Sequence, residues 1–349
     1  MERPNRSYAL LKESTDSCNS AGMNALRTIA GVQRTIPHVL ACCGCNKFFS
    51  TETARKEPEE IKIPVPWGHI AGRWWGPKNQ TPLLALHGWQ DNAGSWDTLI
   101  PLLDPTISVL AIDTPGHGLS SHLPPGIPYY GNESVLFLRR IMKYFGWETV
   151  SLLGHSFGAA EGFIFASAFP DKIDSHIALD ALKPWSLDMS TEPKKFAKNL
   201  DKFLDTVSLN DAETPSYTYE EMIERLHEGM IAKSVTKESC EVLLKRGIIP
   251  ASEGKYYFRR DKRLKIGRFL GWTHHQLMEM TALIKCRVLF IKAMPGLKLE
   301  PENIIEETLN MLKKSSKEFV YKTVEGTHHV HLNNPERVAP IINEFLAPK

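Results

Sequence analysis

The sequence lacks the marks of a disulfide-linked, membrane-spanning or nucleic-acid-binding protein. It has only six cysteines in 349 residues, and three of them crowd into the tetrapeptide CCGC at residues 42–45. This spacing argues against a disulfide framework and fits a reducing compartment, and CCGC has no second ligand pair to complete a zinc site. No apolar run reaches the ~18 residues of a membrane-spanning helix. The formal net charge of +2 argues against nucleic-acid partners, which usually require a basic excess.

Acidic residues are absent between Ser17 and Thr51, where Arg27, Arg34 and Lys47 stand among scattered serines and threonines. An arginine-bearing, acid-poor segment is typical of a mitochondrial import sequence. The alternative is a disordered tail on a cytoplasmic or peroxisomal protein. We therefore treat residues 1–58 as an extension outside the fold.

The rest of the chain alternates short apolar runs with helical patterns. Two runs at 61–65 and 69–76, separated by Pro66-Trp67-Gly68, predict a β-hairpin. Continuous apolar runs predict buried strands at 82–88, 107–113, 149–155, 175–180, 287–292 and 318–324. Helices are predicted at 132–146, 157–169 and 301–315, and over 335–346 with Asn334 as cap and Pro335 as first residue. This alternation predicts an α/β fold with a mostly parallel central sheet and helices on both faces.

Residues 184–284 interrupt the alternation with several helical patterns and no convincing strand. Because structureless loops longer than ~15 residues are rare, we expect a helical cap inserted before the last two strands. The predicted core comprises residues 59–183 and 285–349, and the cap comprises residues 184–284. Within the cap, Lys255–Arg268 holds seven basic residues and one Asp. We interpret it either as a solvated face or as a surface that attracts an anionic ester or thioester, such as an acyl-CoA.

The segment VSLLGHSFGAAEGF, residues 150–163, joins an apolar run, a Gly-x-Ser-x-Gly pentapeptide and a helical pattern. This order is the pattern of a nucleophile elbow. The tight turn explains Gly154 and Gly158, because side chains there would collide with the backbone. Ser156 would stand at the N-terminus of the helix, where the backbone amides favour negative charge. Ser156 is therefore the predicted nucleophile.

A serine hydroxyl needs a base, and in folds with this elbow the chain order is serine, acid, histidine. The stretch GTHHVHL near the C-terminus follows the last predicted strand. We favour His328 as the base, because this loop normally carries it two residues after the glycine, and His329 and His331 are its rivals.

Two carboxylates are candidates for the acid that orients the imidazole. Asp180 ends a predicted strand at the edge of the sheet where the elbow should lie. Glu300 is the first carboxylate after the next strand, where many hydrolases of this fold hold their acid. We favour Asp180, and Glu300 stays open.

Acyl transfer also needs donors for the developing oxyanion. The backbone N–H groups of Trp89, in the loop LHGWQDN, and of Phe157, directly after the nucleophile, are the predicted pair. His87 and Asp113 are expected to be structural. A metal site in the histidine loop is not expected, because the only carboxylate nearby in sequence is Glu325.

Five segments carry a family resemblance: VPWGHIAGRWWG, LHGWQDNAGSWDTLIPLL, GHGLSSHLPPGIPYY, LLGHSFG and RRDKRL. They resemble the α/β-hydrolase superfamily, and more narrowly the serine hydrolase-like proteins, including the kraken-type hydrolases of insects. The resemblance covers residues 60–347 and implies a serine hydrolase with a helical cap and no metal or organic cofactor. Related epoxide hydrolases and haloalkane dehalogenases carry Asp where this chain has Ser156, which favours acyl transfer.

We therefore expect a catalytic triad of Ser156, His328 and Asp180 that cleaves a small-molecule ester or thioester through an acyl-enzyme. The cap would decide which acyl chain fits. The alternative is a ligand-binding protein of the same fold that does not turn over its ligand, because fold alone does not establish catalysis.

Overall fold

A computed structural model of the chain describes residues 57–131, 133–208, 214–267 and 271–348. The predicted import segment and the CCGC cysteines lie outside these ranges. Cys240 and Cys286 lie inside them, and both are buried free thiols. Within the described residues, no helix has the length and apolar character needed to cross a membrane.

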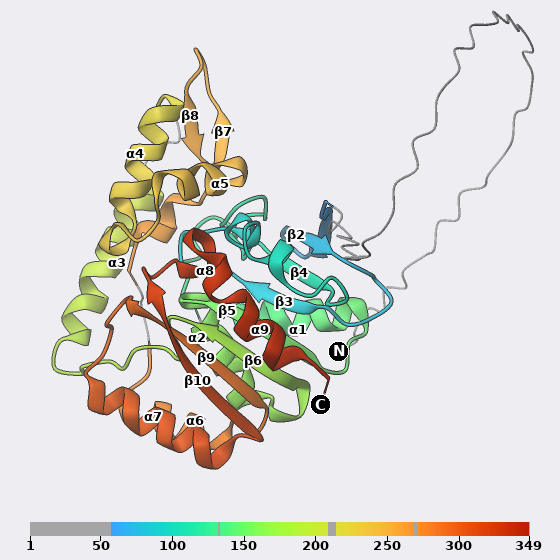
Figure 1. The fold of residues 1–349 in the computed structure, drawn as a ribbon. Helices are drawn as coiled ribbons and strands as arrows, with labels where there is room; N and C mark the ends of the chain where they lie inside the picture. Colours follow the sequence, from blue (N-terminus) through green and yellow to red (C-terminus); the bar gives the residue numbers. More distant parts are fainter. Residues whose placement is uncertain (1–56, 132, 209–213, 268–270, 349) are drawn as a thin grey trace, which may run out of the picture. The chain divides into compact units, whose positions relative to one another are not determined.

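An eight-stranded sheet forms the centre of the described structure, in the order β1-β2-β4-β3-β5-β6-β9-β10 (Figure 1). The strands are β1 Glu59–Val65, β2 Gly68–Trp75, β3 Leu83–Leu86, β4 Val109–Ile112, β5 Val150–His155, β6 Ile173–Leu179, β9 Arg287–Pro295 and β10 Glu318–Gly326. The predicted hairpin is confirmed, since β1 and β2 pair antiparallel with Ile63 opposite Ile70. β2 is also antiparallel to β4, whereas all pairs from β4 to β10 are parallel.

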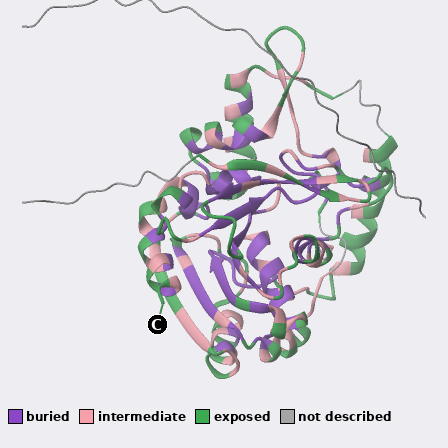
Figure 2. Cartoon of the chain, turned by 90° about the vertical axis from the view of Figure 1, so that its right-hand side faces the viewer, coloured by how far each residue is buried: buried purple, intermediate pink, exposed green. Residues whose placement is uncertain are grey.

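Helices cover both faces of this sheet, as predicted. On one face, helices α1 Ser134–Phe145, α2 Phe157–Ala168, α6 His274–Leu283 and α7 Glu302–Ser315 share a core with the sheet. On the other face, α9 Ala339–Leu346 and two short 3₁₀ helices, Ala93–Trp96 and Ile100–Leu102, share a second core. All residues of β3 and β4 are buried, which explains their continuous apolar sequences. Figure 2 shows the buried residues concentrated in the strands between the two helical layers.

The single helix predicted to open at Asn334 and Pro335 was wrong. A 3₁₀ turn spans Pro335–Arg337, and α9 starts separately at Ala339. The physical reason is Pro340, which has no N–H and is tolerated only in the first turn of a helix. The Asn334 side chain makes no capping hydrogen bond.

The segment between β6 and β9 is mainly helical, with helices α3 Glu192–Ser208, α4 Tyr219–Gly229 and α5 Lys237–Gly247. The expectation that it holds no strand was wrong, because β7 Ile248–Pro250 and β8 Tyr256–Phe258 form an antiparallel pair. Each of these strands has only three residues, which is too short for an alternating pattern to show. Helix α6 packs on α2 and α7, so its contacts favour an insertion that ends before residue 274 rather than at residue 284.

The insertion is fixed unequally to the core. In α5, Arg246 forms an ion pair with the buried Asp113 at 2.7 Å, and it also contacts Glu60. The Asn92 side chain donates to the Leu243 carbonyl at 3.0 Å. Helix α3 buries only Phe203 among its described residues. The α5 end of the insertion is therefore anchored, and α3 is the less embedded part.

Candidate active site

The connection between β5 and α2 is a strained turn with Ser156 at its apex. Ser156 has φ 52° and ψ −113°, a conformation that non-glycine residues rarely adopt. A Cβ atom on Gly158 would lie 2.2 Å from the Leu86 carbonyl oxygen, and one on Gly154 would lie 2.5 Å from the Ala159 nitrogen. Both glycines are thus required by backbone packing, as the sequence predicts.

A chain of hydrogen bonds joins three of the predicted residues. The Ser156 hydroxyl lies 2.8 Å from Nε2 of His328. Nδ1 of the same ring lies 2.6 Å from Oδ2 of Asp180. A carboxylate only accepts, so Nδ1 carries the proton and Nε2 is free to accept one from the serine. This is the tautomer that a general base needs.

Asp180 follows β6 in the left-handed backbone region, with φ 57°, and both of its oxygens are occupied. Oδ1 accepts from the Ala293 amide at 3.0 Å and from the Lys292 ammonium. Oδ2 accepts from the Leu297 amide at 3.0 Å, in addition to His328. The end of β9 and the loop after it therefore hold the carboxylate in a fixed orientation.

Glu300, the alternative acid, lies in a different environment. It forms an ion pair with Lys183 and accepts from the Ser186 amide at 2.8 Å. Burial alone would raise its pKa, but the bonds from Lys183 and Ser186 lower the pKa below its ordinary value. Of the two carboxylates that the sequence offers, the structure brings Asp180 and not Glu300 to His328.

The two rival histidines are engaged elsewhere. Nδ1 of His329 lies 2.8 Å from the Ser234 hydroxyl, and Nε2 of His331 lies 2.7 Å from the Ser95 hydroxyl. Both rings are buried, and burial lowers their pKa values well below the ordinary value. They are therefore neutral at pH 7 and support the loop that carries His328.

Beneath this loop, three buried side chains meet in a way that sequence reasoning missed. Asp91, His155 and His331 each place a donor or acceptor atom within 4.8 Å of the other two. One atom on each, Oδ2 of Asp91 and Nδ1 of both histidines, has no hydrogen-bond partner among the described residues. Burial raises the pKa of Asp91 to about 7. These are the described residues that could hold a metal ion.

The separation of these three atoms bears on what they could hold. Two ligands on one zinc ion stand at most ~4.2 Å apart, since each bond is ~2.1 Å long. Atoms up to 4.8 Å apart would have to close in to bind zinc, whereas a water with hydrogen bonds of ~2.8 Å would bridge them. The aspartate in the quoted LHGWQDN segment was the only available signal, and its meeting with two distant histidines depends on the fold.

The two predicted oxyanion donors flank Ser156. Phe157 is the first residue of α2, and its ring lies 4.9 Å from that of Trp89. A Cβ atom on Gly88, directly before Trp89, would lie 3.4 Å from Cβ of Ser156. Neither the Trp89 amide nor the Phe157 amide donates to a residue within the described ranges.

His87 and Asp113, which the sequence predicts to be structural, make hydrogen bonds to the backbone of neighbouring loops. His87 bonds through Nδ1 to the Gly88 carbonyl at 2.7 Å, and its Nε2 accepts from the Thr114 amide at 3.1 Å. Asp113 accepts from the Ala93 amide at 2.7 Å and pairs with Arg246. Both residues brace loops around the site.

A cavity of about 380 Å³ opens beside Ser156 and His328. Its volume falls in the range of small-molecule sites. Its apolar wall includes Trp89, Phe157, Ile164, Met230 and Trp272. The core supplies the first three of these, and the last two follow α4 and precede α6, so both parts of the fold enclose the space.

Comparison with known proteins identifies the family. The family model of the alpha/beta hydrolase fold matches residues 81–272. The chain is 41% identical to a "Probable serine hydrolase" of Drosophila melanogaster, over 82% of this chain and 87% of that protein. It is 36% identical to "Serine hydrolase-like protein 2" of Homo sapiens, over 82% of this chain and 93% of that protein.

A solved structure has the same fold. The crystal structure of a hypothetical protein from Pseudomonas aeruginosa is 29% identical and superimposes with a TM-score of 0.74, over 83% of this chain and 100% of that chain. Together with the elbow and its histidine, these matches establish the family. The chain belongs to the α/β-hydrolase fold family and, within it, to the serine hydrolase-like proteins.

Proposed function

We propose that this protein is a serine hydrolase that cleaves a carboxylic ester or thioester through an acyl-enzyme on Ser156. The observation that carries the proposal is the hydrogen-bonded series from Asp180 through His328 to Ser156, at the wall of an enclosed cavity. A binding protein without turnover would have no need of a strained serine joined to a histidine in its basic tautomer.

Each residue has a defined role in the proposed reaction. The Ser156 oxygen attacks the carbonyl carbon of the substrate while Nε2 of His328 takes the hydroxyl proton. The carbonyl oxygen becomes negative and accepts hydrogen bonds from the Trp89 and Phe157 amides. His328 then gives its proton to the leaving alcohol or thiol. A water next attacks the acyl-enzyme while His328 takes its proton, and His328 returns a proton to the Ser156 oxygen as the acid product leaves. Asp180 holds the ring in its basic tautomer and stabilises the imidazolium.

The test combines covalent labelling with turnover. A fluorophosphonate probe should label the wild-type chain at Ser156, and short p-nitrophenyl esters should be hydrolysed. Ser156→Ala should lose the label and at least ~10³-fold in kcat/KM. Ser167→Ala, in the same helix but bonded only to the Ile164 carbonyl, is the matched control and should keep both.

Two outcomes would contradict the proposal. Unlabelled wild-type protein that still binds an ester analogue would indicate a ligand-binding protein. Undiminished ester hydrolysis by Ser156→Ala would show that the activity arises elsewhere.

A further inference from the structure

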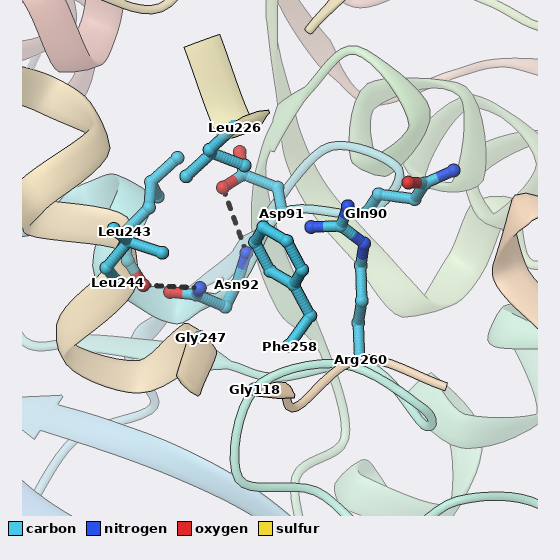
Figure 3. A pocket seen from close by; sticks show the side chains of 10 residues that line it. All are labelled: Gln90, Asp91, Asn92, Gly118, Leu226, Leu243, Leu244, Gly247, Phe258 and Arg260. Atoms are coloured by element: carbon cyan, nitrogen blue, oxygen red, sulfur yellow. Dashed lines mark hydrogen bonds between the residues drawn. The ribbon is translucent and has the colours of Figure 1, made fainter. Parts of the chain in front are cut away.

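One cation on the described part of the cavity wall lacks an ion-pair partner. Arg260, which follows β8 in the insertion, lines both the large cavity beside Ser156 and a narrow space of about 10 Å³ next to Asp91. Figure 3 shows its side chain extending past the Phe258 ring, with the guanidinium beside Gln90 and Asp91. Among the described residues it makes no ion pair and no side-chain hydrogen bond, and its Nε atom is buried.

Two buried arginines of this protein, Arg246 and Arg263, each have an ion-pair partner. Arg263, three residues along the chain, pairs with Asp261 at 2.6 Å and donates to the Leu123 carbonyl at 2.7 Å. Arg246 pairs with Asp113 at 2.7 Å. Buried charges are normally paired, because removing an ion from water is costly. Arg260 is half-buried at the cavity wall and has no such partner within the described ranges, so its guanidinium is available to an anion from outside the chain.

The remaining charges around the cavity do not supply that anion. Lys183 and Glu300 neutralise each other in a buried ion pair. Glu161 is buried and bonded to the Ser134 hydroxyl, and burial raises its pKa well above the ordinary value, which favours the neutral acid. His155 and His329 are held neutral by burial, which lowers their pKa values. Among the described residues of the wall, one positive charge is thus left uncompensated.

Asp91 is the acidic group that acts on this guanidinium through space, but it forms no ion pair with it. Asp91 accepts instead from the Asn92 amide at 2.9 Å. Burial lowers the pKa of Arg260 to about 10, so the side chain stays protonated at pH 7. Phe258 covers one face of the guanidinium, with Cζ 4.3 Å from the ring centroid, which leaves its N–H edge for a planar, two-oxygen acceptor.

We propose that Arg260 binds a carboxylate of the substrate, so that the cavity selects esters or thioesters that carry a negative charge. This inference rests on the proposed hydrolase function and names its substrate class. It also narrows the earlier interpretation of the basic stretch Lys255–Arg268, because Arg260 is the basic residue of its described part that lines the cavity, while Arg263 holds the insertion to the core. A carboxylate matches the fork geometry of arginine and would be bound by two charge-assisted hydrogen bonds.

The kinetic test compares matched anionic and neutral esters. The mono-p-nitrophenyl esters of adipic and suberic acid place a carboxylate on the acyl side, and their methyl-capped diesters are the neutral partners. Para-acetoxybenzoate and its methyl ester place the charge on the alcohol side. In Arg260→Gln the ratio of kcat/KM, anionic over neutral, should fall about 10- to 100-fold in at least one series. Arg260→Lys should lose less, and Arg259→Gln, a neighbouring cation that does not line the cavity, should keep the wild-type ratio.

A binding measurement separates this inference from the proposed function. Calorimetry with adipate and suberate on the Ser156→Ala protein, with and without Arg260→Gln, reports carboxylate binding without turnover. If hydrolysis fails but Arg260-dependent binding persists, the hydrolase proposal is wrong and the carboxylate site stands. If neutral esters are hydrolysed while neither the ratio nor the binding depends on Arg260, the carboxylate site is wrong and the hydrolase proposal stands.

Discussion

Replacing Asp180 by Asn tests the orientation of the whole site, because the carboxylate accepts on both oxygens. An asparagine has one oxygen and one NH₂ group in place of the two carboxylate oxygens. Its NH₂ group must therefore face hydrogen-bond donors, whichever way the side chain is turned. With its oxygen toward Ala293 and Lys292, the NH₂ group faces the Leu297 amide and Nδ1 of His328. The ring would then have to present Nδ1 as an acceptor, which puts the proton on Nε2 and removes the base. The opposite orientation preserves the histidine tautomer but leaves the Lys292 and Ala293 donors without an acceptor.

Both orientations have a calculable cost. A buried donor left unpaired costs about 1–3 kcal/mol, and a hydrogen bond to a charged group is worth about 1.5–3 kcal/mol. We therefore expect Asp180→Asn to lower the free energy of unfolding by about 2–4 kcal/mol. The wrong tautomer should lower kcat/KM by about 10⁴-fold. Urea unfolding measures the loss of stability, and p-nitrophenyl ester kinetics together with the rate of fluorophosphonate labelling measure the loss of activity.

Glu300→Gln is the matched control for this variant. It breaks the buried pair with Lys183 and should cost about 3–5 kcal/mol of stability, yet the chain from Asp180 to Ser156 is untouched. Folded Glu300→Gln protein should therefore label at nearly the wild-type rate. An Asp180→Asn protein within a few-fold of wild-type kcat/KM, or a folded Glu300→Gln protein that is equally impaired, would refute the reasoning.

Two further predictions concern packing and pH. Gly158→Ala should lower the free energy of unfolding, measured by urea denaturation, by about 3 kcal/mol, because its Cβ would lie 2.2 Å from the Leu86 carbonyl oxygen. Gly229→Ala is the control, because no atom lies within 4 Å of the added Cβ, and it should keep the wild-type stability. Equal stabilities of the two variants would argue against this close approach of α2 to β3. Burial lowers the pKa of His176 from 6.5 to about 4, so the unfolded chain binds the proton at a higher pH than the folded chain does. The contribution of this residue to the free energy of unfolding, about 3 kcal/mol, is therefore present above pH 6.5 and lost as the pH falls toward 4. Between pH 6.5 and 4, the free energy of unfolding of His176→Leu should change less with pH than that of the exposed control His275→Leu. Parallel pH profiles of the two variants would contradict the assignment.

Local sequence patterns predicted those parts of the fold and site that depend on near neighbours. The strand–glycine–serine–glycine–helix order around Ser156 was predictable, because the glycines are required locally. A side chain on Gly158 would collide with the neighbouring strand β3. Strands β3 and β4 consist entirely of apolar residues, and this composition predicted that they are buried on both faces. Position along the chain also made His328 and Asp180 candidates, because His328 follows one predicted strand and Asp180 ends another.

The remaining features depend on contacts between distant segments. Asp180 and Glu300 follow neighbouring strands of the sheet, and only the folded loop after β9 decides which one meets the histidine. Asp91 lies in the loop after β3, His155 ends β5 and His331 lies in the short helix α8 (Val330–Asn333), so no spacing in the chain indicates the cluster. The same holds for Arg260 among the basic residues of its stretch, because short strands and turns give no periodic pattern from which a facing direction can be derived.

The anchoring of the insertion through α5 limits how small molecules can enter and leave the cavity. A swing of this end of the insertion away from the core would separate Arg246 from Asp113, and leaving one partner of a buried pair alone costs about 3–5 kcal/mol. Conformations opened in that way would make up less than about one molecule in a hundred. Small molecules would therefore enter and leave through local movements of loops and side chains, which are faster than the hinge motion of whole domains.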